Sequence, residues 1–378
     1  MAAHEPLLNA GLAASLGNPS CVFVTGGPRE YLPGINCVAN QLQAVRSKHP
    51  LLVLVDAEEE AYMRQRVTHA TVAAWRHFPV PQSGTFRKAE GWKYRARYAM
   101  DKLNLFGLPF PRAVWLDADV FVRTNVDELC ELPPSVTLAT TLNVGGKVRP
   151  TACWPHRTRC ENRSCPREYD LENDAQRSYL LRRPSELQPP MERCPYIVQS
   201  GVMSLVPLPP PQFAARVVAP VGRGEVLSYD GGDQGAINTL LYDGRHAVWR
   251  DGLARLHPAY NVLARTQKHS ARSMGGIPPK LVHYTRESRP WQHRIDPSDA
   301  NGSEWLRACA ASVCTAEDAT APADAAAAAA TAAVPLSGVG KLARGGKRAG
   351  SKDASAVLKA RMGLAAGWHE YCRGRRVP

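Results

Sequence analysis

The sequence lacks several features that would assign it to a large class of protein at once. It has no run of about 18 or more apolar residues, so we expect no transmembrane helix. No Gly-x-Gly-x-x-Gly follows the first apolar run at residues 21–25, which argues against a dinucleotide-binding oxidoreductase. The apolar stretch 7–16 has no basic residue before it and is a poor signal peptide. We therefore expect a cytoplasmic protein, with a Golgi or secretory lumen as the alternative if the N-terminus is incomplete.

The charge of the chain is unevenly distributed. The 378 residues are enough for one large domain or two ordinary ones, and the hydrophobic content of 44% supports a substantial core. The net charge is +13. Residues 341–378 hold ten Lys or Arg against two acidic residues, so this segment contributes +8 (10 − 2) and the rest +5. Such a tail could contact an acidic surface or could be a solvated end, and we expect no specific nucleic-acid partner.

Four of the ten cysteines lie in one polar segment. Cys153, His156, Cys160 and Cys165 give the spacing Cys-x2-His-x3-Cys-x4-Cys, in which four soft ligands could hold one structural Zn²⁺. In an oxidising compartment the same thiols would form disulfides, and Asn162 would begin a glycosylation sequon. Unliganded thiols are the third interpretation, and the three stay open.

Continuous apolar runs alternate with helical periodicity in the first third of the chain. Buried strands are predicted at residues 21–25, 51–55 and 113–116, and helices over 35–45, from Glu58 and over 99–106. Strands that alternate with helices are typical of an α/β fold with a mainly parallel, helix-covered sheet. Ligands of such sheets bind at the carboxyl ends of the strands.

Composition divides the chain into four parts. We expect an N-terminal extension at 1–19, a main domain at 20–296, a low-complexity Ala/Gly-rich linker at 297–352 and a basic tail with one short helix at 353–378. Within the main domain, the Cys- and Pro-rich segment 143–195 is predicted to be an insertion. Sheet elements resume at 196–206, and a loop leads into a helix over 224–241.

The run 113–120 is an apolar strand that ends in two aspartates, Asp117 and Asp119. Alternate residues of an extended chain point to the same face, so the two carboxylates can converge on one cation. Hard divalent cations favour carboxylate ligands and can hold phosphates beside them. The pair therefore indicates a metal site for a nucleotide diphosphate, although two solvated carboxylates at a strand end would look the same in a sequence.

Five motifs, in the correct order, resemble those of glycosyltransferase family 8, which contains glycogenin, plant glucuronosyltransferases and galactinol synthases. They are 31–34 (Y-x-x-G), 116–119 with 125–129 (LDAD…NVDEL), 200–203 (SGVM, after Gln199 in place of the usual Asn), 229–235 (YDGGDQG) and 283–285 with 289–291 (HYT…RPW). The resemblance covers roughly residues 20–295.

This resemblance implies a GT-A fold, a single Rossmann-like domain for nucleotide-diphospho-sugars. It also implies a Mn²⁺-dependent, retaining transfer of a hexose or hexuronic acid from a UDP-sugar to an acceptor hydroxyl. Asp117, Asp119 and His283 would be the metal ligands, a donor set that suits Mn²⁺.

The resemblance further assigns contacts with the UDP-sugar donor. Thr25 and Tyr31 would line the uridine pocket; Lys102 and Ala118 would contact the donor; Gln199, Ser200 and Asp230 would bind sugar hydroxyls; Asp233, Gln234 and Arg289 would be catalytic. Arg289 stands where the family has Lys and keeps a positive charge for the diphosphate. Arg286 replaces a family Gly, so backbone approach to phosphate is less assured there.

Acceptor and assembly are open at this level. A carbohydrate, inositol or a glycoprotein could be the acceptor, and a homodimer is an alternative to a monomer. A galactinol-synthase-like transfer to inositol and a non-catalytic sugar-nucleotide-binding scaffold are the competing hypotheses. The acidic residues and His283 would be retained in an active enzyme, whereas a scaffold would be expected to lose one of them.

Overall fold

The computed structural model describes residues 11–79, 99–142, 198–226, 232–242, 252–264 and 277–285, together with residues 291, 305, 308 and 309. The chain divides into two compact units, Met1–Thr285 and Arg286–Pro378. The expected domain boundary at 296 and the divisions at 19 and 352 stay predictions. In the second unit, the rings of Trp291 and Trp305 pack with their centroids 5.5 Å apart. Within the described part of the chain, no helix has the length and apolarity needed to cross a membrane.

A seven-stranded sheet with the order β3-β2-β1-β4-β7-β6-β8 forms the centre of the first unit. Its strands are β1 Val22–Gly26, β2 Leu51–Asp56, β3 Thr71–Trp75, β4 Ala113–Leu116, β6 Leu138–Leu142, β7 Val198–Leu205 and β8 Leu253–Arg255. Strands β3, β2, β1 and β4 are mutually parallel, and β7 alone runs antiparallel to both of its neighbours. The predicted α/β fold with a mainly parallel sheet is confirmed, as are the three apolar strands.

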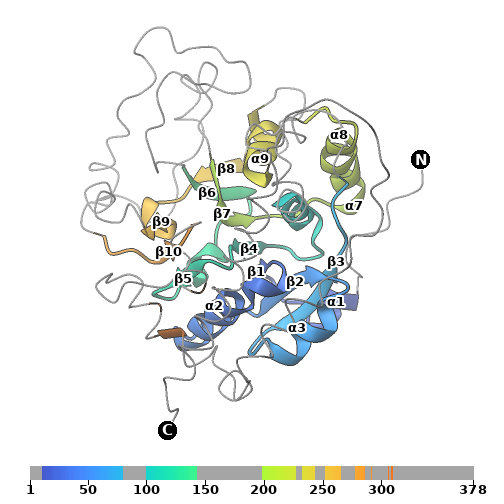
Figure 1. Ribbon diagram of the computed structural model, residues 1–378. Helices are drawn as coiled ribbons and strands as arrows, with labels where there is room; N and C mark the ends of the chain where they lie inside the picture. The colour runs from blue at the N-terminus through green and yellow to red at the C-terminus, as the bar shows by residue number, and fades with distance from the viewer. Residues whose placement is uncertain are drawn as a thin grey trace, which may run out of the picture. The chain divides into compact units, whose positions relative to one another are not determined.

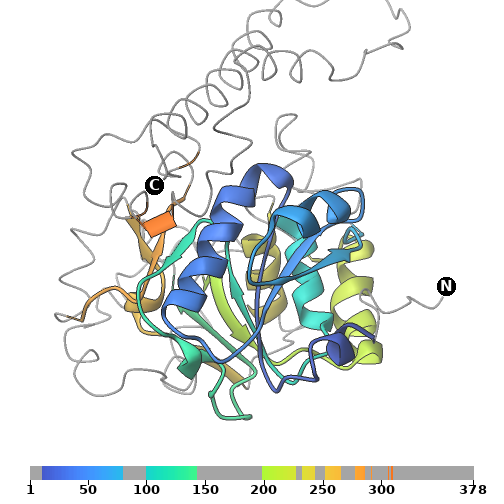
Figure 2. The same ribbon diagram turned by 90° about the horizontal axis from the view of Figure 1, so that it is seen from below.

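Helices cover both faces of this sheet (Figure 1). One face packs against α2 Leu32–Ala44 and α3 Glu60–Arg66, which Figure 2 brings in front of the sheet. The other face packs against η3 Lys102–Gly107 and α9 Asp233–Tyr242. Three consecutive short helical segments cover the same face, namely α7 Pro210–Phe213, η6 Ala214–Val218 and α8 Ala219–Gly222. The short α1 Gly11–Ser15 packs on this second core. The helices predicted at 35–45, from 58, over 99–106 and within 224–241 are all present.

A second sheet of three short strands was not predicted. It consists of β5 Val120–Val122, β10 Leu281–His283 and β9 Val262–Leu263, in that order. Strand β10 is antiparallel to β5, with His283 opposite Val120, and parallel to β9. This register places the end of β10 beside Asp119, the residue that precedes β5.

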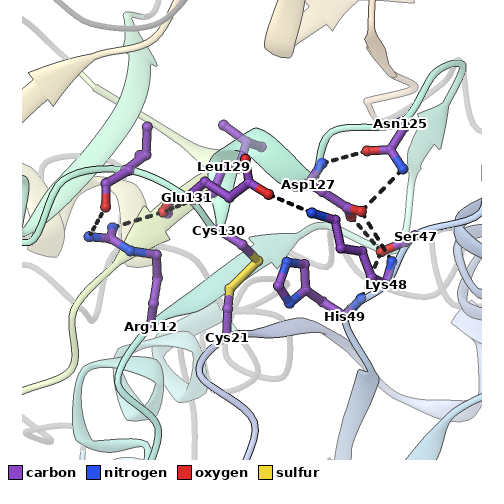
Figure 3. Close-up of a disulfide and its surroundings, with 12 residues drawn as sticks. Cys21, Ser47, Lys48, His49, Arg112, Asn125, Asp127, Leu129, Cys130 and Glu131 are labelled. Carbon is purple, nitrogen blue, oxygen red and sulfur yellow. Dashed lines mark hydrogen bonds and ion pairs between the residues drawn. A yellow bond between two sulfur atoms is a disulfide. The ribbon is translucent and has the colours of Figure 1, made fainter.

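A disulfide joins Cys21, immediately before β1, to Cys130, immediately after the turn η4 Asp127–Leu129 (Figure 3). The two α-carbons are 5.6 Å apart, and 109 positions separate the residues in sequence. Cys37 and Cys309 are also disulfide-bonded, so no cysteine in the described part of the chain is a free thiol. The Cys-rich set at 153–165 lies outside the described residues, and its zinc, disulfide and thiol interpretations stay open.

Next to the disulfide, Asp127 ties η4 to the segment before β2 (Figure 3). Its carboxylate accepts hydrogen bonds from Ser47 Oγ at 2.6 Å and from the Lys48 amide at 3.1 Å. Burial raises the pKa of Asp127, but these donors and the amide of Asn125 lower it more, so the net shift is downward. The motif 125–129 thus serves to hold the end of the sheet together.

We expect the Cys21–Cys130 bridge to carry a substantial part of the stability. Replacing both cysteines by Ala should lower the free energy of unfolding by about 2–5 kcal/mol, because a long loop is released in the unfolded chain. Chemical denaturation of the double variant and the parent, both without reductant, measures this. Titration of ten reactive thiols in the untreated, denatured parent, the number in the sequence, would contradict the bridge.

Candidate functional site

Two short segments bring the predicted metal ligands together at the carboxyl end of β4. Asp117 follows β4, and its amide donates to the carbonyl of Gly201 on β7 at 2.8 Å. The carbonyl of Asp119 accepts from the Tyr284 amide at 2.8 Å, which continues the β5–β10 pairing. One ligand atom each from Asp117, Asp119 and His283 lies within 4.8 Å of the others. His283 Nε2 is 3.0 Å from Asp119 Oδ1 and 3.6 Å from Asp117 Oδ2.

Lys102 forms a second part of this cluster. It begins η3, and its Nζ lies 2.9 Å from Asp117 Oδ1 and 2.7 Å from Asp233 Oδ2. The same ammonium donates to the carbonyl and hydroxyl oxygens of Ser200 at 3.3 and 3.4 Å. Only 9% of the Lys102 side chain is exposed. The lysine therefore links β4, β7 and the N-terminus of α9 in one buried network.

The network carries an excess of negative charge. The cluster holds three carboxylates, Asp117, Asp119 and Asp233, and the single ammonium of Lys102, so its formal charge is −2 when His283 is neutral. Burial raises the pKa of Asp117, and nearby Asp119 adds to this, while Lys102 opposes it. Burial lowers the pKa of Lys102 and of His283, but the facing carboxylates outweigh it, so both pKa values are raised. A site with this charge attracts a divalent cation.

The residues present fit such a cation. Two carboxylates and one imidazole are ligands that Mn²⁺ accepts. Gly201 leaves the room that the imidazole occupies, because a Cβ there would lie 2.4 Å from Cε1 and 2.6 Å from Nδ1 of His283. The donor set, the charge excess and the glycine therefore agree with a metal site.

The other predicted site residues divide into three groups. Ser200 and Asp233 belong to the cluster, and the half-buried Gln199 and Gln234 neighbour them in sequence. The buried Ala118 sits between the two aspartates. Thr25 and Tyr31 lie outside the cluster, on β1 and on the short 3-10 helix η1 Arg29–Tyr31. Thr25 is fully buried, and its Oγ1 makes no hydrogen bond within the described part of the chain; Tyr31 packs on Gly27. Asp230, Arg286 and Arg289 lie outside the described residues.

Two contacts to the cluster were missed by sequence reasoning. Trp115 Nε1 donates to Asp117 Oδ1 at 2.7 Å, and Asn261 Oδ1 lies 3.0 Å from His283 Nδ1. Trp115 carries a sequence signal, because it stands two positions before Asp117 and so shares its face of the strand. Asn261 has none, since it sits in an irregular turn between η8 Pro258–Tyr260 and β9.

A neighbouring group of ionisable side chains fixes the start of η3. His77 Nδ1 is 2.7 Å from Asp101 Oδ2, and Asp101 Oδ1 accepts from the Phe78 amide at 2.5 Å. Burial raises the pKa of Asp101 to about 6, although the Phe78 amide and His77 oppose the shift. His77 Nε2 lies 3.6 Å from the buried carboxylate of Asp56. Because Asp101 precedes Lys102, these contacts help to set the position of the lysine.

Among known proteins, only solved structures are similar to this chain. No protein-family model matches the chain, and no curated protein does. It is similar to the galactosyltransferase LgtC in complex with donor and acceptor sugar analogues, at 14% identity and a TM-score of 0.49, over 77% of this chain and 95% of that one. The chain is also similar to the bifunctional glycosyltransferase WbbM, at 12% identity and a TM-score of 0.47, over 77% of this chain and 50% of that one. A third similar structure is mouse xyloside xylosyltransferase 1, at 13% identity and a TM-score of 0.39, over 70% of this chain and 98% of that one. At these scores the likeness carries no argument about activity, and the α/β fold rests on the strand topology of the chain itself.

Proposed function

We propose that this protein is a metal-dependent, retaining glycosyltransferase with a GT-A fold. It would move a hexose or hexuronic acid from a UDP-sugar to an acceptor hydroxyl. One observation carries the proposal: Asp117, Asp119 and His283 converge at the carboxyl end of β4, beside the Lys102–Asp233 pair. The order of the family 8 motifs supports it independently of this geometry.

The residues of the chain divide the chemistry between them. A Mn²⁺ held by Asp117, Asp119 and His283 would supply a Lewis acid for the diphosphate of the departing UDP. Asp233, at the start of α9, would stabilise positive charge that develops at the donor sugar carbon. Lys102 would hold the Asp233 carboxylate in place, since its ammonium lies 2.7 Å from Oδ2.

Sequence motifs alone place the remaining donor contacts. Gln234 would face the donor sugar, and Gln199, Ser200 and Asp230 would bind its hydroxyls. Arg289 would hold the diphosphate, and Thr25 and Tyr31 would line the uridine pocket. The acceptor would be a hydroxyl of a carbohydrate, inositol or a glycoprotein.

UDP release from a panel of UDP-sugars tests the proposal. We expect turnover of one among UDP-glucose, UDP-galactose, UDP-glucuronic acid and UDP-N-acetylglucosamine with Mn²⁺, and none with excess chelator. Restoring Mn²⁺ after chelation controls for damage to the protein. A folded protein that neither turns over a donor nor binds UDP in a Mn²⁺-dependent way would overturn the proposal and favour the scaffold hypothesis.

The disulfides bear on where the protein would work. Disulfides persist in oxidising compartments and are rare in the cytosol of mesophiles. The Cys21–Cys130 bridge therefore favours a Golgi or secretory lumen over the cytoplasmic location that the N-terminal sequence suggests. We propose the lumenal alternative on this ground.

A further inference from the structure

Two of the three ligand side chains, Asp117 and His283, have one atom turned toward the other ligands and one atom held from behind. In Asp117, Oδ1 accepts from Trp115 Nε1 at 2.7 Å and lies 2.9 Å from Lys102 Nζ. The other oxygen, Oδ2, is the one that faces His283. Because both donors engage Oδ1, the carboxylate cannot rotate without losing them, and Oδ2 stays directed into the cluster.

The same division holds for the imidazole of His283. Its Nδ1 lies 3.0 Å from Asn261 Oδ1, and its Nε2 lies 3.0 Å from Asp119 Oδ1. A carbonyl oxygen can only accept a hydrogen bond, so Nδ1 carries the proton in this contact. In the neutral ring, Nε2 then carries no proton, and its lone pair can bind a cation. Asn261 thereby selects both the orientation and the tautomer that suit ligation.

The burial of Asn261 indicates that stability alone does not explain the residue. The side chain is 8% exposed, and its buried Nδ2 has no hydrogen-bond partner among the described residues. A buried donor without a partner costs stability, so an Asn at this position is a poor choice for the core. Within the described part of the chain, the side chain makes its hydrogen bond to His283.

We propose that Asn261 and Trp115 are positioning residues for the cation site. Asn261 holds the Nδ1 side of His283, and Trp115 holds the Oδ1 side of Asp117. The inference rests on the proposed function, since it takes the cluster to be a cation site. Neither residue contacts the cation, and both act through the ligands that do.

Asn261 offers the sharper test, because it has both a disruptive and a conservative replacement. Asn261→Leu keeps the approximate size of the side chain and removes the acceptor, so the affinity for Mn²⁺ should fall by about 10- to 100-fold. Asn261→Asp retains an acceptor for Nδ1–H and should bind Mn²⁺ at least as tightly as the parent. The rescue by Asp separates positioning from a loss of packing.

Trp75, which lies in the same core cluster as Trp115, provides a matched control for it. Trp115→Phe removes the indole N–H but keeps an aromatic ring, and Lys102 still holds Asp117 Oδ1, so we expect a fall of only about 3- to 10-fold in Mn²⁺ affinity. Trp75 stacks on Trp115 with ring centroids 6.4 Å apart, and its buried Nε1 makes no hydrogen bond to any residue that the structure describes. Trp75→Phe makes the same chemical change and should leave the affinity unaltered.

The measurement is Mn²⁺ binding by the nucleotide-free protein, followed by electron paramagnetic resonance. Spin-echo modulation from a directly bound imidazole nitrogen should be present in the parent and weakened in Asn261→Leu, and thermal melting without metal checks that each variant is folded. Parent-like affinity and nitrogen coupling in Asn261→Leu would overturn the positioning role while leaving the proposed function intact. A parent that binds no Mn²⁺ would overturn the metal-dependent function, and the positioning role with it.

Discussion

Replacing Asp119 by Asn should reduce Mn²⁺-dependent transfer by at least about 10³-fold, because it removes a charge from the centre of the proposed cation site. Asp119 is 4% exposed, and its Oδ1 is 3.0 Å from His283 Nε2. Asn preserves the shape of the side chain, so the loss would come from charge rather than packing. We expect Mn²⁺ affinity to fall together with kcat/KM, whereas UDP binding in the presence of chelator should change little.

Asp127→Asn is the matched control for this variant. Asp127 is equally buried at 4% exposure, but its partners are Ser47, Lys48 and Asn125 beside the disulfide, not the cluster. Because its pKa is lowered in the folded protein, Asp127 contributes stability above the unfolded pKa that is lost as pH falls through the folded value. The control should therefore melt earlier at neutral pH yet bind Mn²⁺ normally. If Asp119→Asn retained Mn²⁺-dependent UDP binding, the assigned ligand set would be wrong.

Lys102→Met should damage both stability and activity. The lysine lies between Asp117 and Asp233, and its removal leaves two carboxylates facing each other in a buried site. Breaking a buried ion pair from one side costs about 3–5 kcal/mol, so we expect a loss of this order in the free energy of unfolding. Turnover should fall by about 10²-fold or more, since Asp117 and Asp233 lose the ammonium that holds both carboxylates in position.

Lys48→Met provides the comparison for Lys102. Lys48 also pairs with a carboxylate, Glu131, at 2.7 Å, but both side chains are more than half exposed. Exposed pairs contribute little because water and salt screen them, so the melting temperature and turnover of this variant should match those of the parent. Equal destabilisation by the two substitutions, measured by urea denaturation, would show that the buried network has no special weight.

Much of the main sheet could be predicted from local sequence. Strands β1, β2 and β4 each contain a run of at least three consecutive apolar residues, which is typical of strands buried on both faces. The start of α9 at Asp233 was also visible as a loop-to-helix change. Strand β3 was missed, because the five-residue run 71–75 contains two alanines and lacks a strong apolar pattern.

The disulfide shows the limit of counting cysteines. The sequence drew attention to the cluster at 153–165, yet a bridge in the described part of the chain joins Cys21 to Cys130. Pairing depends on which residues come within reach in the folded chain, and sequence alone does not give connectivity. Cys21 looked like an ordinary apolar residue at the start of a strand.

The sequence by itself determined the α/β class, the strand that ends in Asp117 and Asp119, and the helix that begins at Asp233. Each of these depends on neighbouring residues, whose periodicity and chemistry are legible one segment at a time. Only the tertiary structure decided that Lys102 bridges two carboxylates and that Asn261 holds His283. Those contacts arise where β10 pairs with β5 and where η3 and α9 pack on one face of the sheet. Strands of two or three residues have too little periodicity to predict, and their register comes from hydrogen bonds between segments far apart in the chain.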